Sequence, residues 1–278
     1  MKVVGFIDYF LNEWHANEYP GIIKAYNEKH GMDYQVQYAW AEMDIPGGMS
    51  TDEWCELHGV TRCHSIEELC EKCDCVFVLA PSNSEKHLQY AKAVFQCGKN
   101  SYIDKTFAPD YATAKEIYAL AEKYGVKFFS SSALRYAEEL NAYMGTAKAV
   151  FTTGGGSNFD EYVIHQVEMI VKCMGVGAKQ VCYVENAGQE WVEIAYEDGR
   201  CARMMFAPCM PFVATVSDAE GTKYLPINSS FFDHLIVDIF HFFETGETSF
   251  CACETLEVMK IREAVIKAKS NAGAWLNV

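Results

Sequence analysis

Apolar and polar residues alternate in two patterns along the first 130 residues of the chain. Short apolar runs predict buried strands, and segments with apolar residues at every third or fourth position predict helices. The predicted strands are residues 2–8, 33–41, 75–80, 101–104 and 126–130, and the helices between them are 14–29, 51–58, a short one capped by Ser65, 85–97 and 111–124. Nearly continuous apolar strands separated by helices indicate a parallel sheet covered on both faces, which is a Rossmann-type doubly wound domain.

The alternation of strand and helix patterns ends after residue 130, where strand-like segments dominate. These segments are 146–153, 178–185, 190–196, 200–206 and 212–217, with helices at 161–174 and 256–269. Runs of strands with few helices predict an α+β domain with an open, mostly antiparallel sheet. We therefore expect a Rossmann-type domain over residues 1–130 and an α+β domain over residues 131–278. The terminal helix is a candidate to pack back on the first domain.

Composition and charge narrow the range of partners. Of the 278 residues, 50% are apolar, which suffices for a large core, and the formal net charge is −15. An acidic surface repels phosphate backbones and anionic headgroups, so we expect neither a nucleic-acid nor a membrane partner. No apolar stretch reaches the ~18 residues of a membrane span, and the first residues predict a strand rather than a signal peptide. The expected location is the cytoplasm.

The twelve cysteines raise the question of disulfides or a metal site. They are scattered, and the densest group is Cys70, Cys73 and Cys75, at the end of a predicted helix and the start of a strand. These assignments account for the group without zinc, which needs four converging ligands. We expect reduced, mostly buried thiols and no metal site.

Polar or loop-forming residues directly follow three of the predicted strands. In a doubly wound sheet, ligands bind beyond the carboxyl ends of the strands. The three strand ends are Asp8–Leu11, Pro81–Asn83 and Asp104–Thr106. We expect them to line one crevice, with Lys105 presented at its strand end.

The strand Val76–Pro81, His87 and the stretch Gly98–Thr106 follow one another in the first half. In this order they resemble the Gfo/Idh/MocA oxidoreductases, the relatives of glucose–fructose oxidoreductase and inositol 2-dehydrogenase. That family has an apolar strand ending in proline, a histidine leading the next helix, and a Gly-Lys strand that ends in Glu-Lys-Pro. The last motif reads Asp-Lys-Thr in this chain, so Lys105 matches while both its neighbours differ.

The second half carries further matches to the same family. Glu161, His165 and Glu168 have the spacing of its Asp-x-x-x-His-x-x-Asp linking helix. The run Phe242–Glu247 resembles its helix exit, and a long terminal helix and Trp275 follow. The resemblance therefore covers nearly the whole chain in the right order.

The resemblance implies an NAD(P)-dependent oxidoreductase that transfers a hydride to or from a secondary hydroxyl or carbonyl of a sugar, polyol or related metabolite. It places Lys105 at the nicotinamide and a substrate hydroxyl, where an ammonium lowers the cost of developing alkoxide charge. It makes His165 the general base, because an imidazole pKa of ~6.5 suits proton transfer. Glu161, four residues earlier on the same helical face, would orient that imidazole. The structural alternatives are a solvated lysine, a core histidine and a carboxylate that favours the helix dipole.

The glycine-rich dinucleotide fingerprint is missing. Its three glycine positions hold Ile7, Tyr9 and Asn12, and Asp8 would place a negative charge near the phosphates. The cofactor-binding candidates for NAD or NADP are Asp8, Tyr9, Phe10, Leu11, Trp40, Glu42, Pro81, Asn83, His87, Asp104 and Lys105. The substrate-binding candidates are Arg135, Asn158 and Tyr162.

Two functions therefore remain open. One is an active oxidoreductase whose first loop binds the dinucleotide in a changed geometry. The other is a divergent member that binds a sugar-like ligand, or acts as a regulatory protein, without a dinucleotide. The retained Lys105, Glu161 and His165 favour the oxidoreductase, which is our prediction.

The strands of the second domain also suggest a surface for self-association. Trp191, Ile194 and Met204–Phe206 are candidates for an exposed apolar face of its sheet. Large apolar faces usually find a partner, so we expect a homodimer or homotetramer joined through this sheet. A pure protein-interaction module fits less well, because it has no need of Lys105 and His165.

Overall fold

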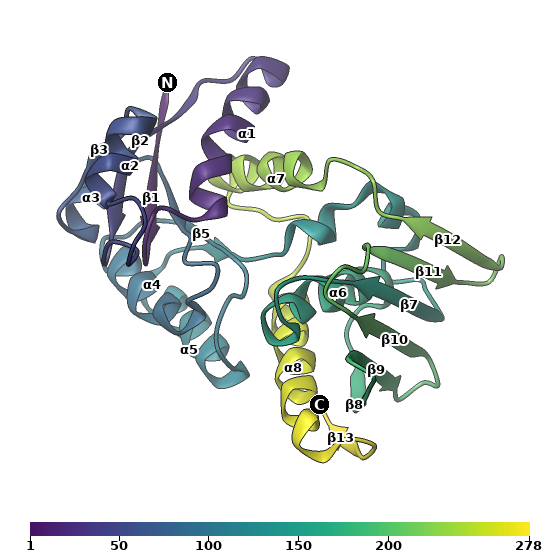
Figure 1. The fold of residues 1–278 in the computed structure, drawn as a ribbon. Helices are drawn as coiled ribbons and strands as arrows, with labels where there is room; N and C mark the ends of the chain where they lie inside the picture. The colour runs from purple at the N-terminus through teal and green to yellow at the C-terminus, as the bar shows by residue number, and fades with distance from the viewer. The chain divides into compact units, whose positions relative to one another are not determined.

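The computed structural model describes residues 1–278 as two units (Figure 1). The first unit comprises Met1–Ser131 and Leu235–Ser249, and the second comprises Ser132–His234 and Phe250–Val278. The chain therefore crosses between the units three times.

A six-stranded, wholly parallel sheet forms the centre of the first unit. Its strands are β1 (Lys2–Asp8), β2 (Tyr34–Ala41), β3 (Thr61–Arg62), β4 (Cys75–Val78), β5 (Ser101–Ile103) and β6 (Phe128–Phe129). They lie in the order β3-β2-β1-β4-β5-β6. This is the order of the doubly wound dinucleotide-binding fold, in which ligands bind where the order reverses, between β1 and β4.

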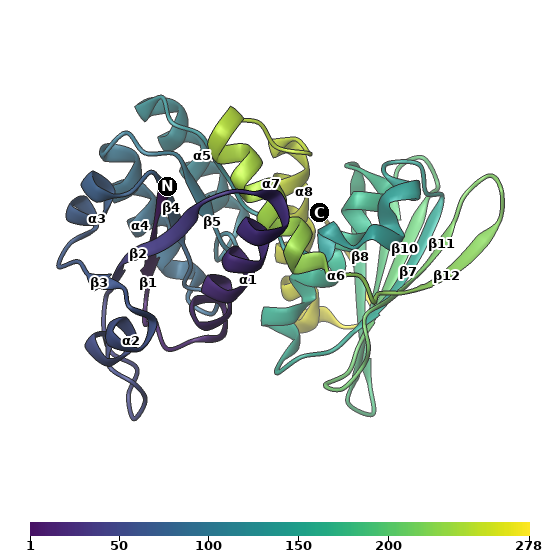
Figure 2. The same cartoon turned by 90° about the horizontal axis from the view of Figure 1, so that it is seen from above.

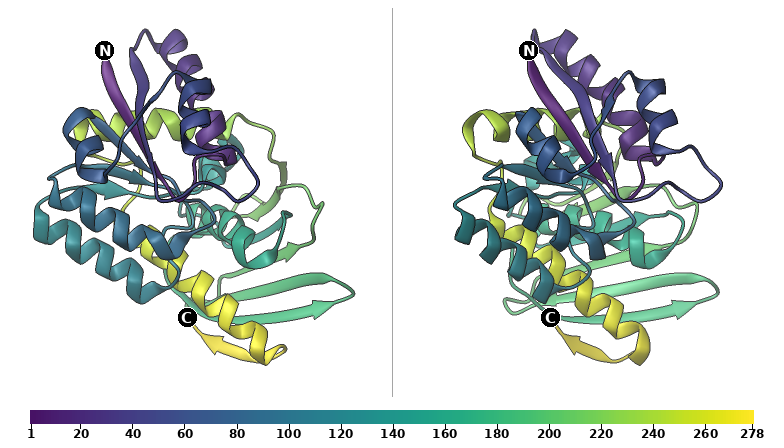
Figure 3. Two further views of the ribbon diagram at one scale, coloured as in Figure 1. Left: turned by 60° about the vertical axis from the view of Figure 1, so that its left-hand side comes forward. Right: turned by 90° about the vertical axis from the view of Figure 1, so that its left-hand side faces the viewer.

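Helices cover both faces of this sheet. They are α1 (Trp14–His30), α2 (Thr51–His58), α3 (Ile66–Lys72), α4 (His87–Gln96), α5 (Tyr111–Tyr124) and α7 (Phe231–Thr245), with one 3₁₀ turn, η1 (Ser84–Lys86), before α4. Phe6 of β1 faces Tyr19 of α1 and Trp54 of α2, with ring centroids 6.5 Å apart in both pairs. A β-carbon on the neighbouring Gly5 would lie 2.7 Å from Leu69 of α3, so this glycine lets α3 approach the opposite face. Figure 3 shows α4 and α5 side by side.

Helix α7 brings a segment from late in the chain back to the first unit. Phe240 stacks on Tyr34 of β2 with centroids 3.7 Å apart, and Phe242 meets Phe129 of β6 edge-on at 5.1 Å. Tyr34 also donates a hydrogen bond to Glu244 at 2.8 Å. The units thus differ from the predicted 131–278 domain, because this aromatic helix, and not the terminal one, belongs with the first sheet.

The second unit is built on a seven-stranded sheet. Its strands, in spatial order, are β12 (Thr222–Pro226), β11 (Val213–Ser217), β7 (Ala149–Gly154), β10 (Cys201–Phe206), β9 (Gln189–Tyr196), β8 (Ala178–Asn186) and β13 (Trp275–Asn277). Only the β7–β10 pair is parallel. Its helices are α6 (Phe159–Met174), α8 (Ala252–Ala268) and the 3₁₀ turns η2 (Ala133–Tyr136), η3 (Glu138–Tyr143) and η4 (Lys269–Asn271). Figure 2 shows α6 and α8 on one face of the sheet.

The covered face of this sheet corrects one expectation. Ile194, Met204 and Phe206 are buried, and Phe206 packs edge-on against Phe159 of α6 at 5.6 Å. Their side chains therefore belong to the core under the helices rather than to an exposed face. Of the predicted face residues, Trp191 is exposed by 37% on the opposite side.

The cysteines also differ in part from the expectation. Ten thiols are free, but Cys251 and Cys253 form a disulfide, so the prediction of reduced cysteines throughout is wrong for this pair. No group of three or more His, Cys, Asp or Glu side chains is arranged to hold a metal ion. None of the helices combines the length and the apolar character needed to cross a bilayer.

Candidate functional site

Lys105 lies two residues beyond the carboxyl end of β5, beside the end of β4. Its Nζ donates to the carbonyl oxygen of Pro81 at 3.4 Å, and its backbone N–H donates to Asp104 Oδ1 at 2.8 Å. The residue is only 8% exposed. Parallel pairing of β4 and β5 thus brings two of the predicted strand ends together. An ammonium has three N–H donors, so this arrangement leaves donors for a ligand.

Asp104 fixes the residues around Lys105. It is buried, its Oδ1 accepts from Tyr102 OH at 3.0 Å, and its Oδ2 forms an ion pair with His15 of α1. Burial favours the neutral carboxyl, but the charges of His15 and Lys105 hold the pKa of Asp104 below its usual value. Asp104 therefore positions Lys105 and His15 from beneath the surface.

Asp8 ends β1 at the same edge of the sheet. Its Oδ1 accepts from the N–H groups of Tyr9 at 2.7 Å and Ala80 at 3.1 Å, while its buried Oδ2 has no hydrogen-bond partner. Burial, followed by the nearby charge of Glu13, raises the pKa of Asp8 well above its usual value. Ala80 has a φ of 53°, in the left-handed region that residues other than glycine rarely adopt. Backbone strain of this kind clusters at functional sites.

Helix α1 begins with a carboxylate as its N-cap. Glu13 accepts hydrogen bonds from the N–H groups of His15, at 2.8 Å, and of Ala16. Burial raises the pKa of Glu13, and the charge of His15 opposes this effect. In the fingerprint loop of this fold, the dinucleotide pyrophosphate sits at the N-terminus of this helix. The backbone N–H groups of this loop already donate to the carboxylates of Asp8 and Glu13. The first loop therefore does not fit a pyrophosphate bound as in the fingerprint loop.

Three cofactor candidates meet in one cluster at the end of β2. Glu42 accepts from Tyr90 OH of α4 at 2.6 Å and forms an ion pair with Lys86 of η1. Lys86 Nζ lies 5.1 Å from the ring centroid of Tyr9, and Trp40 meets Tyr90 edge-on at 5.5 Å. The structure thus places Tyr9, Trp40 and Glu42 in one cluster.

Two further candidates lie inside the protein. The ring nitrogens of His87 lie 3.0 Å from the carbonyl oxygen of Phe107 and 2.6 Å from that of Leu79, and the side chain is fully buried. Leu11 is buried as well. This burial argues against the predicted cofactor contacts of His87 and Leu11: the histidine ties two loops together, and the leucine fills the core. The candidates that keep exposed area at these strand ends are Tyr9, Phe10, Trp40, Glu42 and Asn83.

His165 lies in the first half of α6, in the second unit. Its Nδ1 is 2.6 Å from Ser132 Oγ, and the rings of Tyr162 and Phe212 meet it edge-on at 5.5 and 5.9 Å. When the proton is on Nδ1 and is donated to Ser132, Nε2 is the acceptor that a general base requires. Ser132 was not among the predicted residues, because nothing in its local sequence distinguishes it from Ser130 and Ser131.

Glycines make room for the two rings around His165. A β-carbon on Gly154 would lie 2.5 Å from Phe212, and one on Gly156 would lie 2.1 Å from Tyr162. The run Gly154–Gly156, which begins at the last residue of β7, therefore allows both aromatic side chains to flank the imidazole. Tyr162, a predicted substrate residue, is thereby placed beside His165.

Glu161 and Asn158 form the start of α6. Asn158 is the N-cap: its Oδ1 accepts from the Glu161 N–H at 2.9 Å, and its Nδ2 lies 3.2 Å from Glu161 Oε2. This accounts for Asn158 as a helix cap. The partner found at Nδ1 of His165 is Ser132. The orienting role of Glu161 stays a prediction.

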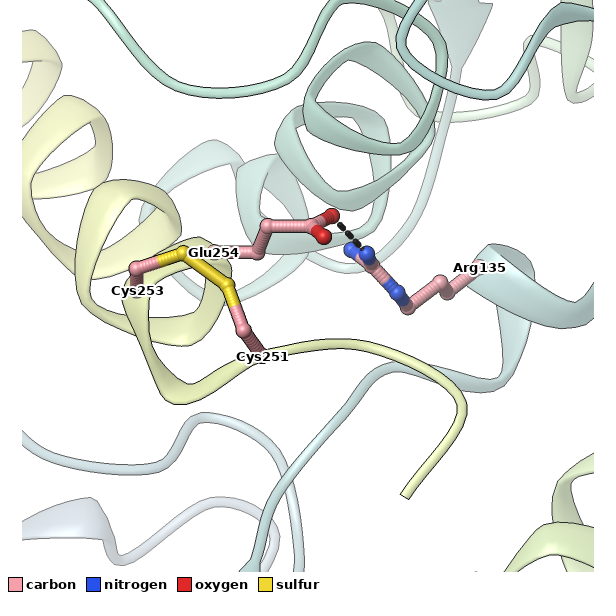
Figure 4. Close-up of a disulfide and its surroundings, with 4 residues drawn as sticks. All are labelled: Arg135, Cys251, Cys253 and Glu254. Carbon is pink, nitrogen blue, oxygen red and sulfur yellow. Dashed lines mark hydrogen bonds and ion pairs between the residues drawn. A yellow bond between two sulfur atoms is a disulfide. The ribbon is translucent and has the colours of Figure 1, made fainter.

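Arg135 is held in a buried ion network rather than presented to a ligand (Figure 4). Its guanidinium donates to Glu168 at 3.0 Å, forms an ion pair with Glu254 of α8, and lies 4.0 Å from the ring centroid of Phe250. Burial opposes the charge, yet the two carboxylates raise the pKa of Arg135. The residue is 5% exposed, which argues against its predicted role in substrate binding. Glu168 also accepts from the Ser132 N–H at 3.1 Å and so links the network to His165.

Part of the chain matches a known family. Residues 45–132 match the model of an oxidoreductase family with an NAD-binding Rossmann fold, GFO/IDH/MocA. The matched segment includes Pro81 and Lys105. Over 61 residues, 22% of the chain, the sequence is 34% identical to the uncharacterized oxidoreductase YhhX of Escherichia coli (strain K12), and the matched part covers 18% of the length of that protein.

Solved structures resemble the whole chain. The myo-inositol dehydrogenase of Lactobacillus casei, in complex with NAD(H) and myo-inositol, matches with a TM-score of 0.81 and 9% identity over 100% of this chain and 96% of that chain. GenD2 from gentamicin A biosynthesis, in complex with NAD, matches with a TM-score of 0.78 and 14% identity over 100% and 97%. At these identities the likeness establishes the fold, and the predicted fold class is confirmed.

Proposed function

We propose that this protein is an NAD(P)-dependent oxidoreductase, because residues 45–132 match the model of the Gfo/Idh/MocA oxidoreductase family and the whole chain has the fold of an inositol dehydrogenase. Its substrate would be a sugar, polyol or related metabolite with a secondary hydroxyl or carbonyl. The observation that carries the proposal is Lys105, a nearly buried ammonium held at the carboxyl ends of β4 and β5. The NAD-binding character of the family supports the choice of cofactor.

In this proposal, the two retained side chains divide the chemistry. The Lys105 ammonium hydrogen-bonds to the reacting oxygen and stabilises the negative charge that develops there. His165 takes the hydroxyl proton at Nε2 during oxidation, while Ser132 holds the imidazole through Nδ1. The polyol in the Lactobacillus casei structure supports a hydroxyl-rich substrate, and Tyr162 beside His165 is our candidate to bind one of its hydroxyls.

A second candidate function is favoured by the first loop. The Glu13 carboxylate lies at the helix N-terminus where the pyrophosphate of a dinucleotide would sit. A chain that binds a sugar-like ligand, or regulates another protein, without a dinucleotide can keep the Glu13 carboxylate at this helix N-terminus. Dinucleotide binding and turnover distinguish the two functions.

The oxidoreductase proposal is tested by turnover with a panel of polyols and sugars and NAD or NADP, followed through the absorbance of the reduced nicotinamide. We expect Lys105→Ala to lower kcat/KM by about 10²–10³-fold, as for the loss of one oxyanion donor. His165→Asn should lower it by about 10²–10⁴-fold. The exposed Lys115→Ala is the control and should behave as the wild type. Near-normal turnover in Lys105→Ala would show that the chemistry is elsewhere.

We further propose that the protein acts in the cytoplasm as a dimer or tetramer of identical chains. Ten free cysteines are typical of a reducing compartment. The open face of the second sheet carries Trp191 stacked beside Phe151, with centroids 6.5 Å apart, and Met205 is paired with Trp191 across the strands. This apolar patch, rather than Ile194 and its buried neighbours, is our candidate for the contact.

A further inference from the structure

The segment that opens α8 contains an exposed disulfide. Cys251 and Cys253 are joined across a single intervening residue, with their Cα atoms 5.2 Å apart, and both residues are exposed. The other ten cysteines of the chain are free, and Cys209, the one among them with an exposed side chain, serves as a comparison. Disulfides in a reducing compartment are usually transient, catalytic or redox-sensing rather than structural.

The position of Cys251 favours exchange at this disulfide. Cys251 is the N-cap of α8, a 17-residue helix, and its side chain makes no capping hydrogen bond. A thiolate at a helix N-terminus is stabilised by the free N–H groups and the helix dipole. Cys251 is therefore the better leaving group of the two, and an incoming thiolate should attack Cys253 Sγ.

Arg135 holds the chain on both sides of the disulfide. Its guanidinium lies on the Phe250 ring, one residue before Cys251, and forms an ion pair with Glu254, one residue after Cys253 (Figure 4). The disulfide closes the short segment between these two anchors. Opening it gives the segment new backbone freedom at the place where both anchors of Arg135 are attached.

The same guanidinium is connected to His165 through a series of hydrogen bonds within the second unit. Arg135 donates to Glu168, Glu168 accepts from the Ser132 N–H, and Ser132 Oγ meets His165 Nδ1. Arg135 and Glu168 are both buried. If one of them shifts, water cannot readily replace the lost hydrogen bond, so the other should shift with it. Arg135, Glu168 and Ser132 thus connect the two residues that flank the disulfide to the imidazole.

We propose that Cys251–Cys253 is a thiol–disulfide exchange site for a dithiol reductant, and that its redox state alters the placement of Ser132 against His165. A thiolate of the dithiol bonds to Cys253 Sγ and breaks the Sγ–Sγ bond, so that Cys251 leaves as a thiolate and is protonated. The second thiolate of the reductant then attacks the reductant's first sulfur, which is bonded to Cys253 Sγ in the mixed disulfide. Cys253 leaves as a thiolate and also takes a proton. The protein gains two electrons and two protons, and the dithiol becomes a disulfide.

Alkylation of the native full-length protein tests the exchange. The protein is treated with N-ethylmaleimide before and after incubation with millimolar dithiothreitol, and the labelled peptides are measured by mass spectrometry. We expect Cys251 and Cys253 to be labelled only after dithiothreitol, the exposed Cys209 to be labelled in both samples, and the buried Cys173 in neither. Labelling of Cys251 and Cys253 without reductant, or only in a denaturant, would overturn the exchange site.

Nuclear magnetic resonance of histidine-labelled protein tests the link to the imidazole. The His165 ring signals, assigned with His165→Asn, should move when dithiothreitol opens the disulfide. The variant Cys251→Ser with Cys253→Ser should show the reduced positions with and without dithiothreitol, and Cys209→Ser should behave as the wild type. Should the double variant not fold, the wild-type titration still decides the question. His165 signals that stay in place while both cysteines become labelled would overturn the coupling, whether or not the protein proves to be an oxidoreductase, because neither measurement uses turnover.

Discussion

At the scale of the residue, the buried carboxyl groups at the strand ends of the first sheet have the clearest physical consequences. The pKa of Asp8 is raised well above the ordinary 3.8, chiefly by burial, and this shift has a consequence for stability. The native state therefore binds this proton more tightly than the unfolded state does. Its contribution to stability is present below pH ~4 and is lost as the pH rises toward the folded-state pKa.

This sign predicts the behaviour of Asp8→Asn, which keeps an acceptor for the N–H groups of Tyr9 and Ala80. Relative to the variant, the wild type should lose stability as the pH is raised from about 4 to 7, by an amount that corresponds to a few degrees in Tm. Thermal unfolding of both proteins across this range measures the difference. A difference that is constant with pH, or that grows in favour of the wild type, would contradict the raised pKa.

The residues themselves show what the sequence can predict of a site. Lys105 was predicted from its place after a buried strand and from its flanking motif, because strand order alone decides which strand ends meet. Ser132 was missed, because its role depends on a turn that brings it to α6, and no local pattern marks it. Arg135 was predicted as a ligand residue, but its two carboxylate partners come from distant positions, Glu168 and Glu254.

At the scale of the element, we expect the first turn of α1 to control the affinity for a dinucleotide. Glu13 caps the helix with a negative charge where the fold elsewhere places a pyrophosphate. Removing only the charge, in Glu13→Gln, should therefore tighten the binding of NADH, by about tenfold, or about 1.4 kcal/mol. Isothermal titration calorimetry measures this affinity, with the exposed Glu18→Gln of the same helix as the matched control.

Equal affinities of the wild type, Glu13→Gln and Glu18→Gln would show that the cap is no obstacle. The outcome bears on a feature that pattern reasoning could only partly anticipate. The lost glycines and the unfavourable charge of Asp8 were evident from the sequence, but the filling of the amides by Glu13 follows from its rotamer and the start of the helix. Most long amphipathic helices were predicted close to their observed bounds, but of α7 only the exit at Phe242–Glu247 was recognised. The strands β3 and β13 were missed, because two and three residues are too few for a period.

At the scale of the whole molecule, each unit is built from two separate segments of the chain. Helix α7 returns to the first sheet, because its aromatic residues Phe240 and Phe242 pack on rings that the first 130 residues provide. Period and composition give the apolar face of such a helix but not the sheet on which it packs. The predicted boundary after residue 130 nevertheless lies next to the observed change of unit at Ser131–Ser132.

Self-association is the prediction that belongs to this scale. Trp191→Glu places a charge in the centre of the open face of the second sheet and should convert the proposed oligomer into monomers in sedimentation velocity experiments. Leu57→Glu, at an exposed position of the first unit, should leave the assembly intact. A wild-type protein that sediments as a monomer would refute the proposed assembly.

The most direct test of the central claim is the binding of NADH and NADPH to the wild-type protein, measured by calorimetry. An oxidoreductase of this family should show saturable binding of at least one of them with a Kd below about 1 mM, the ordinary range for enzyme ligands. Lys105→Ala should weaken that binding or leave it intact while turnover is lost. The absence of saturable binding for both nucleotides up to millimolar concentration would contradict the oxidoreductase and favour a protein that uses the crevice without a dinucleotide.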